Sequence, residues 1–148
     1  MNLECKILAF GSKEQQESIG LRREILRLPL KLDFTEEELA CENEQIHIGC
    51  YFEMVLVGIL LLVPKANGFL KMRQVAVSQS IQGKGVGKQM VKYSEEWALK
   101  NGFTKLDLHA RETALSFYLS MKYNVIGDKF IEVGLPHFML EKALKENN

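Results

Sequence analysis

The stretch "VSQSIQGKGVGKQMVKYSEEWALKNGF", Val77–Phe103, decides the fold of this chain. It sets three glycines, Gly83, Gly85 and Gly87, at alternate positions between an apolar run and a helical pattern. Glycine inside structured backbone costs roughly 0.5–1 kcal/mol relative to alanine, so this spacing indicates that side chains would obstruct something. A strand that enters a helix through such a turn directs unpaired amides at one point, where a phosphate fits.

Two better-known phosphate loops are excluded by counting from Gly83. A Walker A loop needs glycine and lysine at the positions that hold Lys88 and Gln89. The dinucleotide fingerprint needs a third glycine where Lys88 stands. A purely structural turn remains the alternative on this stretch alone.

The chain before the glycine turn predicts two helices and four strands. "LECKILAF" has the pattern of a strand, Ser12 is a plausible N-cap for a helix that ends by Pro29, and Thr35 with Glu38 forms a capping box for a short helix. "QIHIGCYF" and "VLVGILLLV" flank the tight connection "EM" and predict a hairpin, and "GFLKMRQVAV" predicts a further strand.

The chain after the turn predicts a helix with Val86, Met90, Tyr93 and Trp97 on one face, ending at "NG". "FTKLDLHA" predicts a strand, "ETALSFYLSMKY" a short helix, and "NVIGDKFIEVG" and "PHFMLEKAL" two more strands. The whole order favours an α/β protein, a mixed sheet with helices on both faces. No repeat or linker divides the chain, so we expect a single domain over 1–148.

Composition excludes several classes of protein. Lysine plus arginine equal aspartate plus glutamate at 19 each, so no overall field attracts nucleic acid or an acidic membrane. The apolar run Met54–Val63 is far shorter than the roughly 20 residues of a membrane-spanning helix. Cys5, Cys41 and Cys50 match neither a disulfide framework nor a zinc pattern, which favours core or near-surface thiols, no metal and a cytoplasmic location.

The register from Gln82 to Gly87 matches Q/R-x-x-G-x-G/A, and the chain resembles the GNAT superfamily of N-acetyltransferases. The family's other elements follow in order: the strand "RQVAV", the turn, the helix ending in "NGF", the strand "KLDLHA", and "ALSFYLSMKYNVIG", which is similar to the family's A-x-x-x-Y helix. The resemblance extends from about residue 21 to residue 140.

The resemblance implies that the turn binds the pyrophosphate of acetyl-CoA and that the pantetheine arm pairs with the strand before it. Arg111 stands where many members carry asparagine, and Gln79 where they carry proline. The resemblance therefore implies these cofactor-binding residues: Val75, Ala76, Val77, Gln82, Gly83, Lys84, Gly85, Val86, Gly87, Lys88 and Arg111.

Acetyl transfer to an amine needs an oxyanion donor, a proton for the departing thiolate and a base. A backbone amide near Val77 suits the oxyanion, and Tyr118 is the candidate acid, since the equivalent tyrosine in the family points at the CoA sulfur. His137 is our candidate base because a histidine titrates near physiological pH. His109 and Glu132 remain alternatives for this role.

The acceptor is not readable from the sequence. A small-molecule amine and a protein amine both stay open, as does a homodimer. We expect the arginines of the first helix, Arg22, Arg23 and Arg27, to be mostly solvated, and Arg73 is a candidate for an acceptor carboxylate. An acyl-CoA-binding sensor and an interaction domain without turnover are the competing functions, and the presence of Tyr118 argues against both.

Overall fold

The computed structural model describes residues 2–145. The chain divides into two compact units: the first takes in the chain up to Val63 and Gln74–Ser94, and the second takes in Pro64–Arg73 and the chain from Glu95 onward. Within the described residues, seven strands form one mixed sheet in the order β1-β2-β3-β4-β5-β7-β6. The expected order of strands and helices is confirmed, whereas the single domain over 1–148 stays a prediction.

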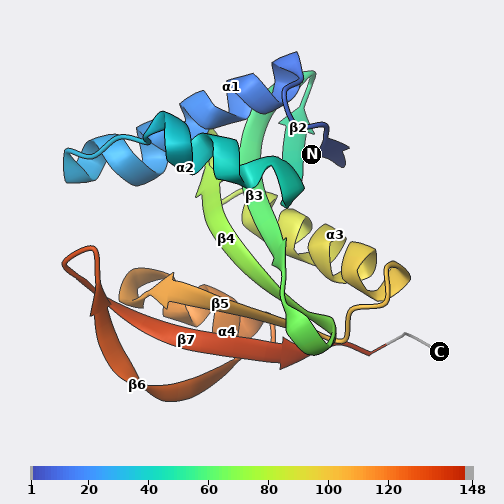
Figure 1. The fold of residues 1–148 in the computed structure, drawn as a ribbon, viewed down its shortest axis with the longest axis vertical. Helices are drawn as coiled ribbons and strands as arrows, with labels where there is room; N and C mark the ends of the chain where they lie inside the picture. The colour runs from blue at the N-terminus through green and yellow to red at the C-terminus, as the bar shows by residue number, and fades with distance from the viewer. Residues whose placement is uncertain (1, 146–148) are drawn as a thin grey trace. The chain divides into compact units, whose positions relative to one another are not determined.

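The elements follow the colour bar of Figure 1 from the N-terminus to the C-terminus. Their bounds are β1 Leu3–Leu8, α1 Lys13–Arg22, α2 Glu36–Ala40, β2 Ile46–Phe52, β3 Val55–Pro64, β4 Phe69–Val77, α3 Val86–Lys100, β5 Lys105–Arg111, α4 Leu115–Ser120, β6 Asn124–Glu132 and β7 Leu135–Ala143.

Both predicted helix starts before β2 are confirmed. The Ser12 hydroxyl accepts a hydrogen bond from the Gln15 amide at 3.1 Å. Thr35 and Glu38 form the reciprocal bonds of a capping box at the start of α2. The first helix ends earlier than expected, because α1 passes at Arg22 into a short π-helical turn, and Pro29 lies inside a 3₁₀ turn beyond it.

In the first unit, helical segments cover both faces of β3, because consecutive strand residues face opposite sides of a sheet. Gly58 lies against Val86 and Met90 of α3. The next residue, Ile59, belongs to a buried cluster on the opposite face. That cluster also contains Leu8 and Ala76, with Leu21, Ile25, Leu26 and Tyr51 packed against it.

In the second unit, the first half of β4 pairs in parallel with β5, from Phe69 opposite Lys105 to Met72 opposite Leu108. Strand β7 runs antiparallel to β5 on one side and to β6 on the other. Almost every residue of β6 is exposed, because β6 is the last strand in the order of the sheet. No helix within residues 2–145 is long and apolar enough to cross a membrane.

The buried face of α3 differs slightly from the predicted one. Val86 and Met90 are buried, and the fully buried positions continue with Ser94 and Ala98. Tyr93 and Trp97 are half-buried at the margin of that face. Ser94 can be buried because its hydroxyl donates to the Met90 carbonyl at 2.9 Å, a bond that the apolar pattern of the sequence does not reveal.

Candidate active site

The predicted glycine turn lies in the first unit, after β4 and a short 3₁₀ turn at Gln79–Ile81. Gly83 and Gly85 have φ values of +81° and +86°, and a Cβ at either position would meet nothing within 4 Å. These two glycines are therefore required by left-handed backbone and not by crowding. Gly87 differs from them, because it is the second residue of α3.

The turn leaves amides available at the start of α3. The Gln89 amide donates to the Gly85 carbonyl at 3.0 Å, so the helical bonding begins with that pair. The amides of Val86, Gly87 and Lys88 precede it and have no partner one turn earlier in the helix. Gly85 has no side chain to cap them, and the first turn contains no acidic residue. The exposed turn is thus suited to an anion.

Gln82 holds the turn against the strand before it. Its Nε2 donates to the Val77 carbonyl oxygen at 3.1 Å, and the neighbouring Ile81 is buried. Gln82 therefore contributes to the shape of the turn through its side chain. Its part in cofactor binding stays a prediction.

Sequence reasoning missed an irregularity in β4. Gln74 has a φ of +57°, which is left-handed backbone inside a strand. A residue of this conformation turns the strand locally and changes the direction of the groups that follow, here Val75–Val77. Glutamine has no special preference for left-handed backbone, so the sequence carried no signal for it.

The candidate acid, Tyr118, lies in α4 of the second unit. It is 5% exposed, and its ring meets those of Phe117 and Tyr123 edge to face, at 4.9 and 5.8 Å between centroids. Burial raises the pKa of Tyr118 above its ordinary value, which keeps the hydroxyl protonated at neutral pH.

The neighbouring Tyr123 hydroxyl is already engaged. It donates to Glu95 Oε2 at 2.9 Å, and Lys142 Nζ binds the other oxygen of the same carboxylate at 2.8 Å. Burial and the Glu95 charge both raise the pKa of Tyr123. Tyr123 is thus held as part of a structural network, which distinguishes it from Tyr118.

The three residues considered for the base meet in one cluster of the second unit. Glu132 Oε1 lies 3.1 Å from Nδ1 of His109, and its Oε2 lies 3.5 Å from Nε2 of His137. The Phe130 ring contacts both imidazoles, at 5.0 Å from His109 and 6.0 Å from His137 between centroids. The carboxylate of Glu132 therefore contacts both histidines, one with each oxygen.

The two histidines are held differently. His137 Nδ1 lies 2.9 Å from the Leu135 carbonyl, which only accepts, so this nitrogen carries a hydrogen. Both nitrogens of His137 thus face acceptors, and its side chain is 6% exposed. His109 instead directs Nδ1 at Glu132, which turns its Nε2 away from the carboxylate, and its side chain is 29% exposed.

A strained hairpin turn positions Glu132. Val133 and Gly134 connect β6 to β7 with φ values of +45° and +76°, the pairing of a tight two-residue turn. Left-handed backbone is unfavourable for a β-branched residue such as Val133.

On the side of β7 that pairs with β5, Arg111 lies opposite His137 in the strand register. Two predicted site residues are therefore neighbours on adjacent strands.

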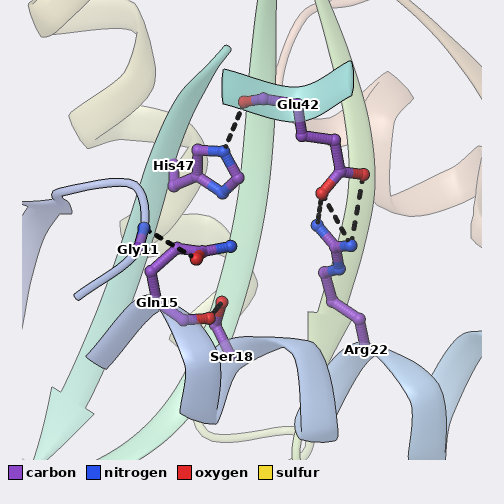
Figure 2. A network of polar contacts seen from close by, with 6 residues as sticks. All are labelled: Gly11, Gln15, Ser18, Arg22, Glu42 and His47. Carbon is purple, nitrogen blue, oxygen red and sulfur yellow. Dashed lines mark hydrogen bonds and ion pairs between the residues drawn. The ribbon is translucent and has the colours of Figure 1, made fainter. Parts of the chain in front are cut away.

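The structure corrects the expectation of solvated arginines on the first helix. Arg22 is 0% exposed and forms a buried ion pair with Glu42, whose two oxygens it contacts at 2.9 and 3.2 Å. Figure 2 shows this pair beside His47, whose Nε2 lies 3.0 Å from the Glu42 carbonyl. Arg23, by contrast, forms an exposed pair with Asp33. Sequence reasoning could not predict this burial, because Glu42 is 20 residues away from Arg22 along the chain.

The remaining predicted residues are distributed between the units. Tyr118, Arg111 and His137 belong to the second unit, and every other predicted site residue belongs to the first, namely Val75, Ala76, Val77, Gln82, Gly83, Lys84, Gly85, Val86, Gly87 and Lys88. Among the described residues, no group of histidine, cysteine, aspartate or glutamate is arranged to hold a metal ion.

Comparison with known proteins identifies the family. The uncharacterized N-acetyltransferase YjcF of Bacillus subtilis is 28% identical over 137 residues, which are 92% of this chain and 97% of the relative. An acyl-CoA N-acyltransferase structure from Pseudomonas aeruginosa matches with a TM-score of 0.80 at 20% identity, covering 96% of this chain and 99% of that one. A GNAT family acetyltransferase from Elizabethkingia anophelis, crystallised with acetyl-CoA bound, matches with a TM-score of 0.72 at 16% identity over 97% of this chain and 99% of that one.

The family model of acetyltransferases matches residues 16–123, from α1 through the glycine turn to the end of α4 and Tyr123. This range includes the turn, the strand before it and the candidate acid. The chain therefore belongs to the acetyltransferase (GNAT) family.

Proposed function

We propose that this protein transfers an acetyl group from acetyl-CoA to a primary amine by direct attack in a ternary complex. The observation that carries the proposal is the exposed glycine turn ahead of α3, with its uncapped amides and left-handed glycines. The relative from Elizabethkingia anophelis, which has the same fold, was crystallised with acetyl-CoA. A second copy of the chain is not needed for this proposal.

The residues of the turn fit the pyrophosphate of CoA. Gly83 and Gly85 have open space where a Cβ would stand, so phosphate oxygens can approach the backbone. Lys84 and Lys88 are exposed beside the amides and add positive charge. Val75–Val77, which follow the irregularity at Gln74, would hold the pantetheine arm through their backbone.

Acetyl-CoA supplies an acyl group activated as a thioester. Tyr118 is assigned to donate a proton to the departing sulfur. Burial raises its pKa, so the hydroxyl keeps its proton at neutral pH and is a weaker acid than an exposed tyrosine. Tyr123 is unsuited to it, since its hydroxyl already donates to Glu95.

The cluster of His109, Glu132 and His137 is assigned to take the proton of the amine. Glu132 is in contact with both imidazoles and stabilises whichever of them is charged. His137 is the base that we infer from the sequence. In His109 the carboxylate of Glu132 binds Nδ1, so Nε2 is the nitrogen that can accept a proton. Both histidines must therefore be tested in the same experiment.

The acceptor is a small-molecule amine or a protein amine, and the protein acts in the cytoplasm, as the three free thiols suggest. The alternative is an acyl-CoA-binding sensor that does not turn over. A buried, protonated Tyr118 favours the enzyme, because a sensor has no use for a proton donor.

The test combines two measurements on the purified protein. Calorimetric titration with CoA measures binding, and the release of free thiol from acetyl-CoA is then followed with a panel of amines, amino acids, polyamines and peptides. Binding together with amine-dependent thiol release supports the proposal. Binding without release across the panel would favour the sensor, and absence of binding would overturn both.

A further inference from the structure

Two cysteines that are distant in the sequence lie directly opposite each other. Cys5 of β1 pairs with Cys50 of β2 in the antiparallel register, and both carry free thiols. Opposite residues of an antiparallel pair have Cα atoms about 4.5 or 5.5 Å apart and side chains on the same face. Both separations fall inside the range of about 4.4–6.8 Å that a disulfide spans. The register therefore places the two Cα atoms at a separation that a cross-strand disulfide can span.

The two thiols differ in access to solvent. Cys50 is 0% exposed, whereas Cys5 is half-buried on β1, the first strand in the order of the sheet. On the other side of β2, Cys50 lies opposite Gly58 of β3, the residue on which α3 rests. An oxidant from solvent thus reaches Cys5 before it can reach Cys50.

The thiols also affect each other. The neighbouring Cys50 and burial raise the pKa of Cys5, and the Cys5 thiol in turn lowers the pKa of Cys50.

We propose that Cys5 and Cys50 form an oxidation site at which hydrogen peroxide produces a disulfide between β1 and β2. The Cys5 sulfur attacks peroxide, the O–O bond breaks, and sulfenic acid and water form. The Cys50 sulfur then attacks the Cys5 sulfur, the S–O bond breaks, and the hydroxyl leaves as water with the Cys50 proton. Two thiols and one peroxide give one disulfide and two waters.

Cys41 provides an internal comparison. It is exposed, and neither of the other cysteines lies opposite it in a described strand pair. Peroxide should convert Cys41 to sulfenic and sulfinic acid, because no thiol is placed to resolve it. At Cys5 the sulfenic acid should not accumulate, since Cys50 is adjacent.

The experiment uses the Cys41→Ser variant of the full chain, which keeps the pair and removes the exposed thiol. The folded protein is treated with hydrogen peroxide, unreacted thiols are alkylated, and peptides are identified by mass spectrometry with and without reduction. We expect a Cys5–Cys50 linked peptide that reduction removes. We also expect the oxidised protein to melt roughly 5–10 °C higher, because the bond restricts the unfolded chain.

Cys5→Ser in the same background is the control, since it removes the half-buried partner and leaves the buried one. It should yield neither the linked peptide nor the rise in Tm. The proposal is overturned if Cys5 in the folded parent stays a thiol or proceeds to sulfinic acid while Cys50 stays reduced. A linked peptide that appears only after denaturation, or that lowers Tm, would equally overturn it.

Discussion

Gly58 of β3 and Val86 of α3 lie so close together that there is no room for a side chain at position 58, not even a single methyl group. A Cβ on Gly58 would lie 2.8 Å from Cγ1 of Val86, a distance that real Cβ atoms do not show. Val86 is the first residue of α3 and follows Gly85 of the turn. The glycine in β3 therefore determines where the N-terminal end of α3 rests on the sheet.

Gly58→Val should shift the start of α3 and weaken CoA binding at least tenfold, with a loss of about 1–3 kcal/mol in the free energy of unfolding. Calorimetric titration and urea unfolding measure the two effects. Gly49→Ala is the matched control, because a Cβ there would lie 3.0 Å from Leu8, on the face opposite α3. If Gly49→Ala weakens CoA binding as much as Gly58→Val, the effect is one of general stability.

The turn itself should act through its backbone more than through its charges. Gly85→Val places a β-branched residue at a φ of +86° and should weaken CoA binding far more than Lys84→Ala does. Lys84 is exposed, so its removal should cost little at physiological salt. A larger loss from Lys84→Ala in calorimetric titration would show that charge, and not the amide cradle, holds the pyrophosphate.

The contrast between the turn and the Glu132 cluster explains what the sequence could predict. Gly83 and Gly85 were predictable because left-handed backbone strongly favours glycine, and the helix that follows has its own local pattern. The contacts of Glu132 with two histidines depend on the register of three strands, β5, β6 and β7, which no local pattern encodes. His109 and His137 were individually visible, but their shared carboxylate was not.

The burial of charged side chains could not be predicted from the sequence either. Arg22 stands on a helix in a pattern typical of solvated arginines, and its burial depends on Glu42, which arrives from a turn after α2. A buried ion pair of this kind is costly to break, because the remaining partner stays charged without compensation. Only the tertiary arrangement reveals that this arginine belongs to the interior of the first unit.

His47 should make stability depend on pH. Burial, the largest cause, lowers its pKa, and the charge of Arg22 acts in the same direction, while the carbonyl and the charge of Glu42 oppose it. The unfolded chain therefore binds a proton more readily than the folded one does. The neutral, buried His47 therefore contributes to stability above the ordinary histidine pKa of about 6.5, and this contribution is lost as pH falls below that value.

The measurement is urea unfolding from pH 8 to pH 5 for the wild type and His47→Gln. The free energy of unfolding should fall more steeply toward acid in the wild type. Equal slopes for the two proteins would assign the acid sensitivity to other groups. The variant will be less stable at every pH, so only the difference in slope is informative.

Tyr118→Phe should preserve folding and acetyl-CoA affinity and should lower kcat by roughly 10²–10⁴-fold, as the loss of a general acid does. Tyr123→Phe is the matched control, because it removes a hydroxyl bonded to Glu95 from a ring that contacts the same Tyr118. It should lower stability and leave most of kcat. Equal losses of kcat in the two variants would reduce Tyr118 to a packing residue.

The base is best identified by comparing His137→Gln with His109→Gln. If one histidine accepts the proton of the amine, kcat/KM for a good acceptor should rise with pH in the wild type, and that part of the rise should disappear in the variant that lacks the base. The amine's own ionisation gives a similar rise in all three proteins. Only the difference between profiles therefore reports on the enzyme.

The contacts of Glu132 make the two outcomes distinguishable. His137 has a carbonyl on one nitrogen and a carboxylate beside the other, so a role as base requires the acceptor amine to approach Nε2 next to Glu132. His109 binds Glu132 through Nδ1, and its Nε2 is turned away from that carboxylate. An acceptor amine could therefore approach Nε2 of His109 without contacting Glu132. A flattened profile in His137→Gln alone supports the base inferred from the sequence, and one in His109→Gln alone moves the role to β5. Unchanged profiles in both variants would leave the cluster structural, because a substrate that binds deprotonated needs no base.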